Sequence, residues 1–263
     1  MDWAPGYREF RPPAPLAGAL ACAWVGVTPP GGAPPTRVLP DACVDLIWQH
    51  GTGVFLAGPD TGPVIMPTSP GTVLAGVRFR PGAGGPALGR PLSGLLNQRL
   101  STDDLRAELP GGAGRRLGSR LPPDLDPPAA LRMLIDLAGG LVTDGPPDPL
   151  VTAAAQLLCR PGAQVGQVAG DLAVSERQLN RRCGAAVGYG PVLLRRVLRF
   201  RRFVSRLDAA PDAADLASLA AEAGYADQAH LTRECGRLAG LTPVALTRDR
   251  HGISDVRRGR TSV

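Results

Sequence analysis

Apolar residues recur every three to four positions through the C-terminal part of the chain, a pattern that predicts a series of short helices. Leu179, Cys183 and Val187 recur at intervals of four and form one apolar stripe. Ser175 stands where an N-cap hydroxyl accepts from free backbone N–H groups, and Gly188 stands where a helix commonly ends. Helices are therefore expected at 164–171, 176–187, 191–207, 215–222 and 228–239.

One unit occurs twice in this part of the chain. Leu179 aligns without a gap on Leu231, an offset of 52 residues, and the matching continues through Cys183 with Cys235, Gly188 with Gly240 and Pro191 with Pro243. A repeat at a fixed offset indicates one supersecondary unit used twice. The unit is predicted to be a helix–turn–helix, at 164–188 and again at 215–240, with the helix over 191–207 joining the copies.

The second helix of each copy carries polar side chains on the face opposite its apolar stripe. A helix–turn–helix presents this second helix to the major groove of DNA. Arg can pair with guanine, Asn or Gln with adenine, and a Thr methyl can touch thymine. A solvated polar face is the alternative, but two copies with matching caps favour DNA reading. The expected base-contacting residues are Arg177, Asn180, Arg181, Gln228, Ala229, Thr232 and Arg233.

The joining helix is rich in arginine, which suggests a surface that faces phosphates, although some of these arginines are expected to be solvated or paired inside the protein. At about 1.5 Å per residue this helix is roughly 25 Å long. It can therefore hold two recognition helices about one DNA turn apart, roughly 34 Å. The expected phosphate-contacting residues are Arg182, Arg195, Arg199, Arg202 and Arg237.

The second copy resembles the second helix–turn–helix of AraC/XylS-type transcriptional regulators. The matching motifs are Gly224-Tyr225, Asp227-Gln228, His230-Leu231, Arg233 and Gly240-Leu241-Thr242-Pro243. The first copy resembles the family through Ala169, Ser175, Leu179, Arg181, Gly188 and Pro191, so the likeness covers roughly residues 150–250. Cys183 and Cys235 depart from it, since the family usually has Phe there. The resemblance implies a bacterial transcription factor that binds double-stranded DNA, with both recognition helices in successive major-groove segments. It also allows RNA polymerase as a partner and a homodimer.

Shorter apolar runs precede the repeat and predict a mainly-β N-terminal half. The fold class expected is α+β with two domains: a cupin-like barrel or sandwich carrying helices, over residues 1–143, and an all-α double helix–turn–helix domain, over 150–263. A flexible joint is expected at 122–128 and a linker at 144–149. Strands are expected at 16–27, 43–48, 52–58, 63–66 and 72–80, and helices at 91–98, 101–109, 129–141 and 150–160.

The N-terminal half resembles sensor domains that precede the DNA-binding pair in many actinobacterial regulators, through the segments 39–48, 57–63 and 76–83. That resemblance implies effector binding or dimerisation, with the effector unidentified. Asp41, Asp45, Trp48 and Arg78 are the residues expected to line an effector pocket. The alternative is that Asp45 and Arg78 pair across strands. His50 is the only histidine here, and one histidine does not suffice for a metal-binding barrel, so no metal is expected.

Charge separates the two halves. Residues 151–263 contain seventeen Arg and ten acidic residues, near +7, while residues 1–150 contain twelve Arg and thirteen acidic residues, near −1; together they give the net charge of +6. This asymmetry indicates a nucleic-acid partner for the C-terminal half. No apolar run is long enough to span a bilayer, so no membrane partner and a cytoplasmic location are expected.

Two other classes of protein remain as alternatives. DNA-repair alkyl-acceptor proteins can carry the same repeated unit, but they need an activated thiolate, usually metal-bound or beside a base. The five cysteines are scattered and form no C-x-x-C motif, so no enzyme activity, catalytic residue or cofactor is expected. The second alternative is a small-molecule-binding module whose DNA binding has decayed, and the N-caps and outward-facing arginines argue against it.

Overall fold

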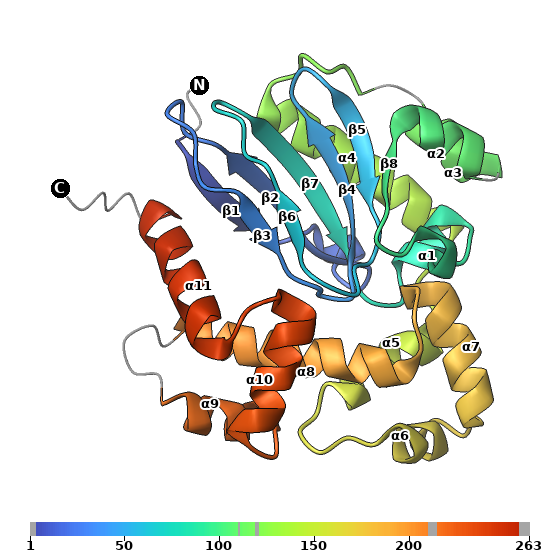
Figure 1. Cartoon of the computed structure of the whole chain (residues 1–263). Helices are drawn as coiled ribbons and strands as arrows, with labels where there is room; N and C mark the ends of the chain where they lie inside the picture. The colour runs from blue at the N-terminus through green and yellow to red at the C-terminus, as the bar shows by residue number, and fades with distance from the viewer. Residues whose placement is uncertain (1–3, 110, 119–120, 210–214, 258–263) are drawn as a thin grey trace.

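The computed structural model describes residues 4–109, 111–118, 121–209 and 215–257. A β-sheet built from the N-terminal half lies above a layer of helices built from the C-terminal half (Figure 1). None of the helices in these residues is both long enough and apolar enough to cross a membrane.

The strands of the N-terminal half are β1 Gly6–Phe10, β2 Leu20–Val27, β3 Thr36–Val38, β4 Val44–Gln49, β5 Gly53–Ala57, β6 Val64–Met66, β7 Val73–Phe79 and β8 Arg99–Ser101. Six of them form one antiparallel sheet in the order β1-β2-β7-β4-β5-β8. Strands β4 and β5 form a hairpin, with Leu46 opposite Leu56. A separate two-stranded sheet joins β3 to β6, with Arg37 opposite Ile65.

The long helix α4, Pro127–Asp144, packs across one face of the six-stranded sheet. Alternate residues of a strand point to the same face of a sheet. Trp48 of β4 and Phe79 of β7 point to the face that the helices cover, and both are fully buried there. The mainly-β N-terminal half is confirmed. The prediction allowed a barrel or a sandwich; within the described strands, the six-stranded sheet is open, with β1 and β8 at its edges. The remaining helical segments of this half are η1 Ala14–Leu16, α1 Gly84–Leu88, η2 Leu92–Leu95, α2 Thr102–Glu108 and α3 Gly111–Gly118.

Segment 122–128, which was expected to be a flexible joint, makes hydrogen bonds with the sheet and with the start of α4. The Trp48 indole Nε1 donates to the Pro122 carbonyl oxygen at 2.9 Å, and the Gly51 N–H donates to the Pro123 carbonyl oxygen at 2.7 Å. Asp126 then caps α4 by accepting from the Ala129 N–H. Backbone carbonyl groups of an irregular segment need hydrogen-bond donors. Here the strand β4 and the turn after it supply two such donors, which tie the segment to the sheet.

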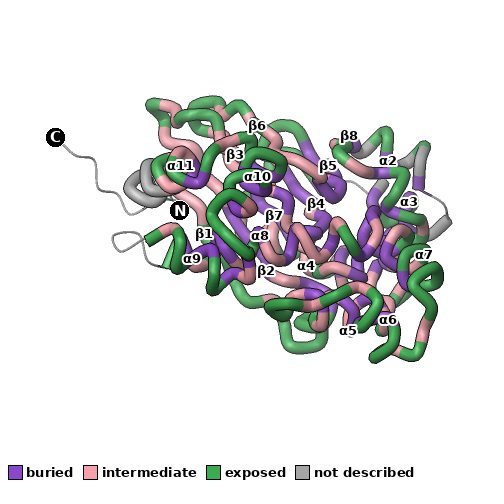
Figure 2. The backbone as a smooth tube through the Cα atoms, turned by 60° about the horizontal axis from the view of Figure 1, so that its bottom comes forward, coloured by how far each residue is buried: buried purple, intermediate pink, exposed green. Residues whose placement is uncertain are grey.

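The C-terminal half is helical throughout its described part. Its helices are α5 Pro149–Leu158, α6 Val165–Asp171, α7 Glu176–Val187, α8 Pro191–Ala209, α9 Leu216–Ala223, α10 Gln228–Ala239 and α11 Pro243–Arg257. The predicted helices are confirmed, and α11 follows them. Their buried core is continuous and includes Phe200, Phe203, Leu179 and Leu231. Figure 2 shows exposed stretches along α6, α7 and α10 on this side of the molecule.

Candidate nucleic-acid interface

Helix α7 is the recognition helix of the first copy, and local side-chain chemistry fixes both its ends. The Ser175 hydroxyl accepts from the Gln178 N–H at 3.2 Å, and the Gln178 side-chain oxygen accepts from the Ser175 N–H at 2.9 Å. This reciprocal capping box satisfies donors that the first turn leaves free. At the other end Gly188 has φ +98°, the left-handed region that glycine adopts at low cost.

Helix α10 is the recognition helix of the second copy and follows the same plan. The Asp227 carboxylate accepts from the His230 N–H at 2.6 Å, and Gly240 ends the helix with φ +67°. The Thr232 hydroxyl donates to the Gln228 carbonyl oxygen at 2.8 Å, which directs part of that side chain back to its own helix.

All seven expected base-contacting residues are exposed: Arg177, Asn180, Arg181, Gln228, Ala229, Thr232 and Arg233. Among the described residues, no hydrogen bond or ion pair occupies the side chains of Arg177, Asn180, Arg181, Gln228 or Arg233. Polar side chains without internal partners are available to a ligand, so the position of each on its recognition helix is compatible with base reading.

The expected phosphate-contacting arginines are different, because most of them bind within the protein. Arg182 forms a two-bond pair with Asp148, at 2.8 and 2.5 Å. Arg202 Nη1 donates to the Ala223 carbonyl oxygen at 3.2 Å, and Arg195 Nη1 donates to the Ala163 carbonyl oxygen at 2.9 Å. The contacts of Arg195 and Arg202 show that the joining helix α8 uses part of its charge to bind both helix–turn–helix units.

Arg199 and Arg237 both approach Glu234, at 3.6 Å each. The Arg199 guanidinium also lies over the Tyr225 ring, 4.5 Å from its centroid, and its Nη2 is 3.1 Å from His230 Nε2. His230 therefore packs against its neighbours. Arg237 keeps 64% of its side chain exposed and is the freest of the five.

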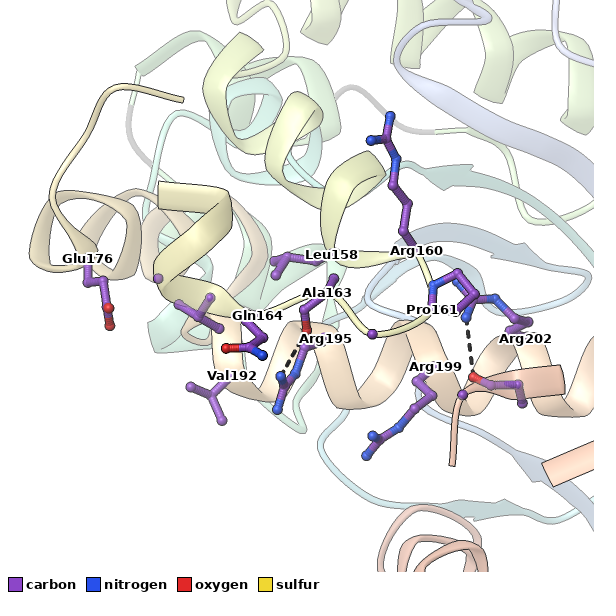
Figure 3. Close-up of a pocket in the computed structure, with 15 residues that line it drawn as sticks. Leu158, Arg160, Pro161, Ala163, Gln164, Glu176, Val192, Arg195, Arg199 and Arg202 are labelled. Atoms are coloured by element: carbon purple, nitrogen blue, oxygen red, sulfur yellow. Dashed lines mark hydrogen bonds between the residues drawn. The ribbon is translucent and has the colours of Figure 1, made fainter. Parts of the chain in front are cut away.

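A groove of about 560 Å³ separates the two helix–turn–helix units (Figure 3). Its lining extends from Glu176, the first residue of α7, to Gly224, four residues before α10. Arg195, Arg199 and Arg202 line it from α8, with Arg160 on the loop after α5. In Figure 3 the Arg160 guanidinium points away from that of Arg195. The groove thus connects the starts of both recognition helices along a strongly basic helix.

Glu234 is a structural residue that the sequence analysis did not identify. It lies on the inner side of α10 and is only 2% exposed. Arg196 binds it at 2.8 and 3.1 Å, so the carboxylate fastens α10 to α8. The sequence did contain a signal for its burial: Glu234 is an acidic residue three positions after Leu231 and one before Cys235, both in the apolar stripe. Burial opposes the charge, but the surrounding arginines outweigh it and lower the pKa of Glu234.

This shift predicts how stability changes with pH. Because the folded state holds the pKa of Glu234 below its ordinary value of 4.5, the contribution to stability is complete above that pH and is lost as the pH falls through the lowered value. We expect the thermal midpoint to fall in this acid range, and to fall less steeply in Glu234→Gln than in the wild-type chain. Parallel midpoint curves for the two proteins would contradict this assignment.

The residues expected to line an effector pocket separate into two groups. Arg78 pairs with Asp45 at 3.0 and 3.1 Å, and Asp41 approaches the same guanidinium at 3.4 Å. Trp48 lies on the opposite face of the sheet, fully buried. Asp45 and Trp48 are both on β4, three positions apart. Because side chains of a strand alternate between its two faces, these two side chains lie on opposite faces of the sheet. Pairing across strands, the alternative interpretation, is what the structure contains.

Three of the buried cysteines, Cys22, Cys183 and Cys235, do not have the environment of a nucleophile. Burial raises the pKa of the Cys183 and Cys235 thiols to about 12 and that of Cys22 to about 11, whereas an activated thiolate needs a lowered pKa. Within the described residues, no group of three or more His, Cys, Asp or Glu side chains is arranged to hold a metal ion.

Together, the two capped recognition helices, the joining helix and the groove define a double helix–turn–helix DNA-binding protein. Comparison with known families agrees. Residues 168–249 match a helix-turn-helix domain family, and residues 8–101 match a domain of unknown function, DUF6597. The matched helix-turn-helix domain is of the AraC type, a domain of DNA-binding transcription regulators.

Other comparisons give less. No curated protein matches the chain. Among solved structures, the apo form of a ToxT point variant from Vibrio cholerae is similar over 86% of this chain and 97% of its own, with 10% identity and a TM-score of 0.47. The unsaturated fatty acid-bound wild-type ToxT from the same organism is similar over 93% and 98%, with 11% identity and a TM-score of 0.43.

Proposed function

We propose that the chain is a sequence-specific transcription regulator that inserts α7 and α10 into successive major-groove segments of one duplex. The observation that carries this proposal is that both recognition helices present exposed polar side chains, most of which bond to no other residue in the described part of the chain, while their opposite faces are buried and their ends capped. Arg177, Asn180 and Arg181 would read one segment. Gln228, Ala229, Thr232 and Arg233 would read the next.

We assign DNA binding to residues 150–263 and effector binding or dimerisation to residues 1–143. The regulator would act in the cytoplasm, where RNA polymerase is a partner for transcriptional control. Asp45 and Arg78 satisfy each other, so this proposal does not rest on an effector site at that pair.

The test uses the full chain and genomic DNA fragments that include its own upstream region, at two salt concentrations. A few fragments should bind tightly against competitor DNA, and affinity should fall steeply with salt because phosphate contacts release counterions. Binding that is equal for all fragments, or absent, would contradict sequence-specific regulation.

The groove gives a prediction about phosphate contacts. Arg195 lines it beside Val192 (Figure 3) and uses only its Nη1 on the Ala163 carbonyl oxygen, so we expect the guanidinium also to contact phosphate and its replacement by alanine to weaken binding to operator and random DNA alike. The slope of log affinity against log salt should fall by about one phosphate contact. Arg160→Ala is the matched control, since its guanidinium points away in Figure 3 and its removal should leave the slope unchanged. A loss confined to the operator would show that Arg195 does not contact the backbone.

A further inference from the structure

The segment Pro59–Pro63, between β5 and β6, lies against the C-terminal ends of both recognition helices. A Cβ placed on Gly188, the residue that ends α7, would lie 2.8 Å from Pro59 Cγ. A Cβ placed on Gly240, the residue that ends α10, would lie 3.4 Å from Pro63 Cγ. Five consecutive residues of the N-terminal half therefore connect the ends of two helices that are 52 residues apart in the sequence.

This segment is held firmly from behind. Asp60 is 8% exposed, and Arg99 of β8 binds both its carboxylate oxygens, at 3.0 and 2.7 Å. The Asn97 side-chain oxygen accepts from the Thr61 N–H at 2.8 Å, and the Asn97 N–H donates to the Pro59 carbonyl oxygen at 3.0 Å. A loop with this many internal partners keeps one conformation.

Arg37 of β3 strengthens the contact with α10. Its Nη1 donates to the Ala239 carbonyl oxygen at 3.0 Å, and its Nε lies 3.5 Å from the Asp249 carboxylate of α11. The last carbonyl groups of a helix lack intrahelical partners and carry partial negative charge, so a guanidinium there is favourable. Arg37 and residues 59–63, which we name the bracket, thus join α10 to the N-terminal half.

The first recognition helix is held by the same half at further points. A Cβ on Gly85 of α1 would approach the Ala185 carbonyl oxygen to 2.5 Å, so α1 and α7 pack with their backbones in close contact. The N-terminal half thus contacts α7 and α10 at their C-terminal ends, through Pro59 at Gly188 and through Pro63 and Arg37 at the end of α10, and it bears on where these ends lie relative to each other.

We propose that the bracket is a positioning element that sets the separation of the two recognition helices, and so determines which spacing of DNA segments the protein accepts. This inference rests on the proposed function. It gives a role to residues 59–63, which are part of the segment 57–63 that resembles sensor domains.

The experiment measures the affinity of the full chain for its selected operator and for versions with one or two base pairs added or removed between the two segments. The wild-type chain should lose about tenfold in affinity for each base-pair contact that the altered spacing removes. Arg37→Ala should broaden the optimum, so that discrimination between spacings falls severalfold while the salt slope is unchanged. A glycine inserted between Thr61 and Gly62 should shift or broaden the optimum and serves as the second variant.

Arg80→Ala is the matched control. Arg80 Nε also donates to a backbone carbonyl, that of Ala17 at 2.9 Å, but both residues lie within the N-terminal half. If Arg37→Ala and the insertion lower affinity equally at every spacing, as a purely structural role would, the bracket proposal is overturned. If the wild-type chain shows no sequence-selective binding at any spacing, the proposed function fails instead.

Discussion

Replacing Glu234 by alanine is expected to destabilise the folded chain by about 3 kcal/mol, since removal of one partner leaves buried charge uncompensated. The side chain is 3% exposed and its carboxylate contacts Arg196, Arg199 and Arg237, at 2.8 to 3.6 Å. We place the loss at the lower end of the range for buried pairs because Arg196 is 28% exposed and water partly screens it. Denaturant unfolding of the full chain measures the loss.

The exposed pair between Arg206 and Glu222 is the control for Glu234. Its two atoms are 2.6 Å apart, but the side chains are 41% and 53% exposed. Glu222→Ala should therefore cost less than about 1 kcal/mol. If the two substitutions destabilise the chain equally, Glu234 does not fasten α10 to α8 in the way described.

Replacing Arg233 by alanine is expected to cost about 1–3 kcal/mol of binding to the operator and to relax specificity at one base position. Arg233 is exposed on α10, and an arginine that pairs with guanine in the major groove discriminates among bases. Affinity measured against operators mutated one position at a time would locate the relaxed base.

Arg237 on the same helix provides the comparison. It is 64% exposed and is expected to contact phosphate, so Arg237→Ala should weaken all sequences by a similar factor. Arg233→Ala must behave differently, with a larger loss on the operator than on random DNA. Equal losses on both would remove Arg233 from the reading residues.

The C-terminal half could be predicted from the sequence because its determinants are local. Ser175, Asp227, Gly188 and Gly240 specify helix ends through their own side chains or backbone freedom, and apolar stripes specify the buried faces. The repeat supplied independent support for each helix. These signals placed α7 at the residues where the structure has it.

The N-terminal half was predicted less well because its elements depend on distant partners. Strands β1, β3 and β8 have three to five residues each, and their pairing partners are far along the chain for β3 and β8. Proline-rich segments were expected to be loose, yet Pro122 and Pro123 accept hydrogen bonds from the sheet. Strand pairing and such acceptors arise from tertiary structure, which a local pattern does not encode.

The candidate site shows the same limit. Exposure of Arg177 and Arg233 followed from helix periodicity, but the partners of the other arginines did not. Asp148 is 34 residues from Arg182, and Arg196 is 38 residues from Glu234. The composition shows an excess of positive charge. How many of these arginines form ion pairs and hydrogen bonds within the protein depends on how the helices pack.

The central claim is that α7 and α10 read two segments of one duplex. Selection of bound sequences from a randomised duplex pool by the full chain tests it most directly. We expect two short enriched blocks whose centres lie about 10–10.5 base pairs apart, one helical turn. Enrichment of a single block, or of none, would contradict it.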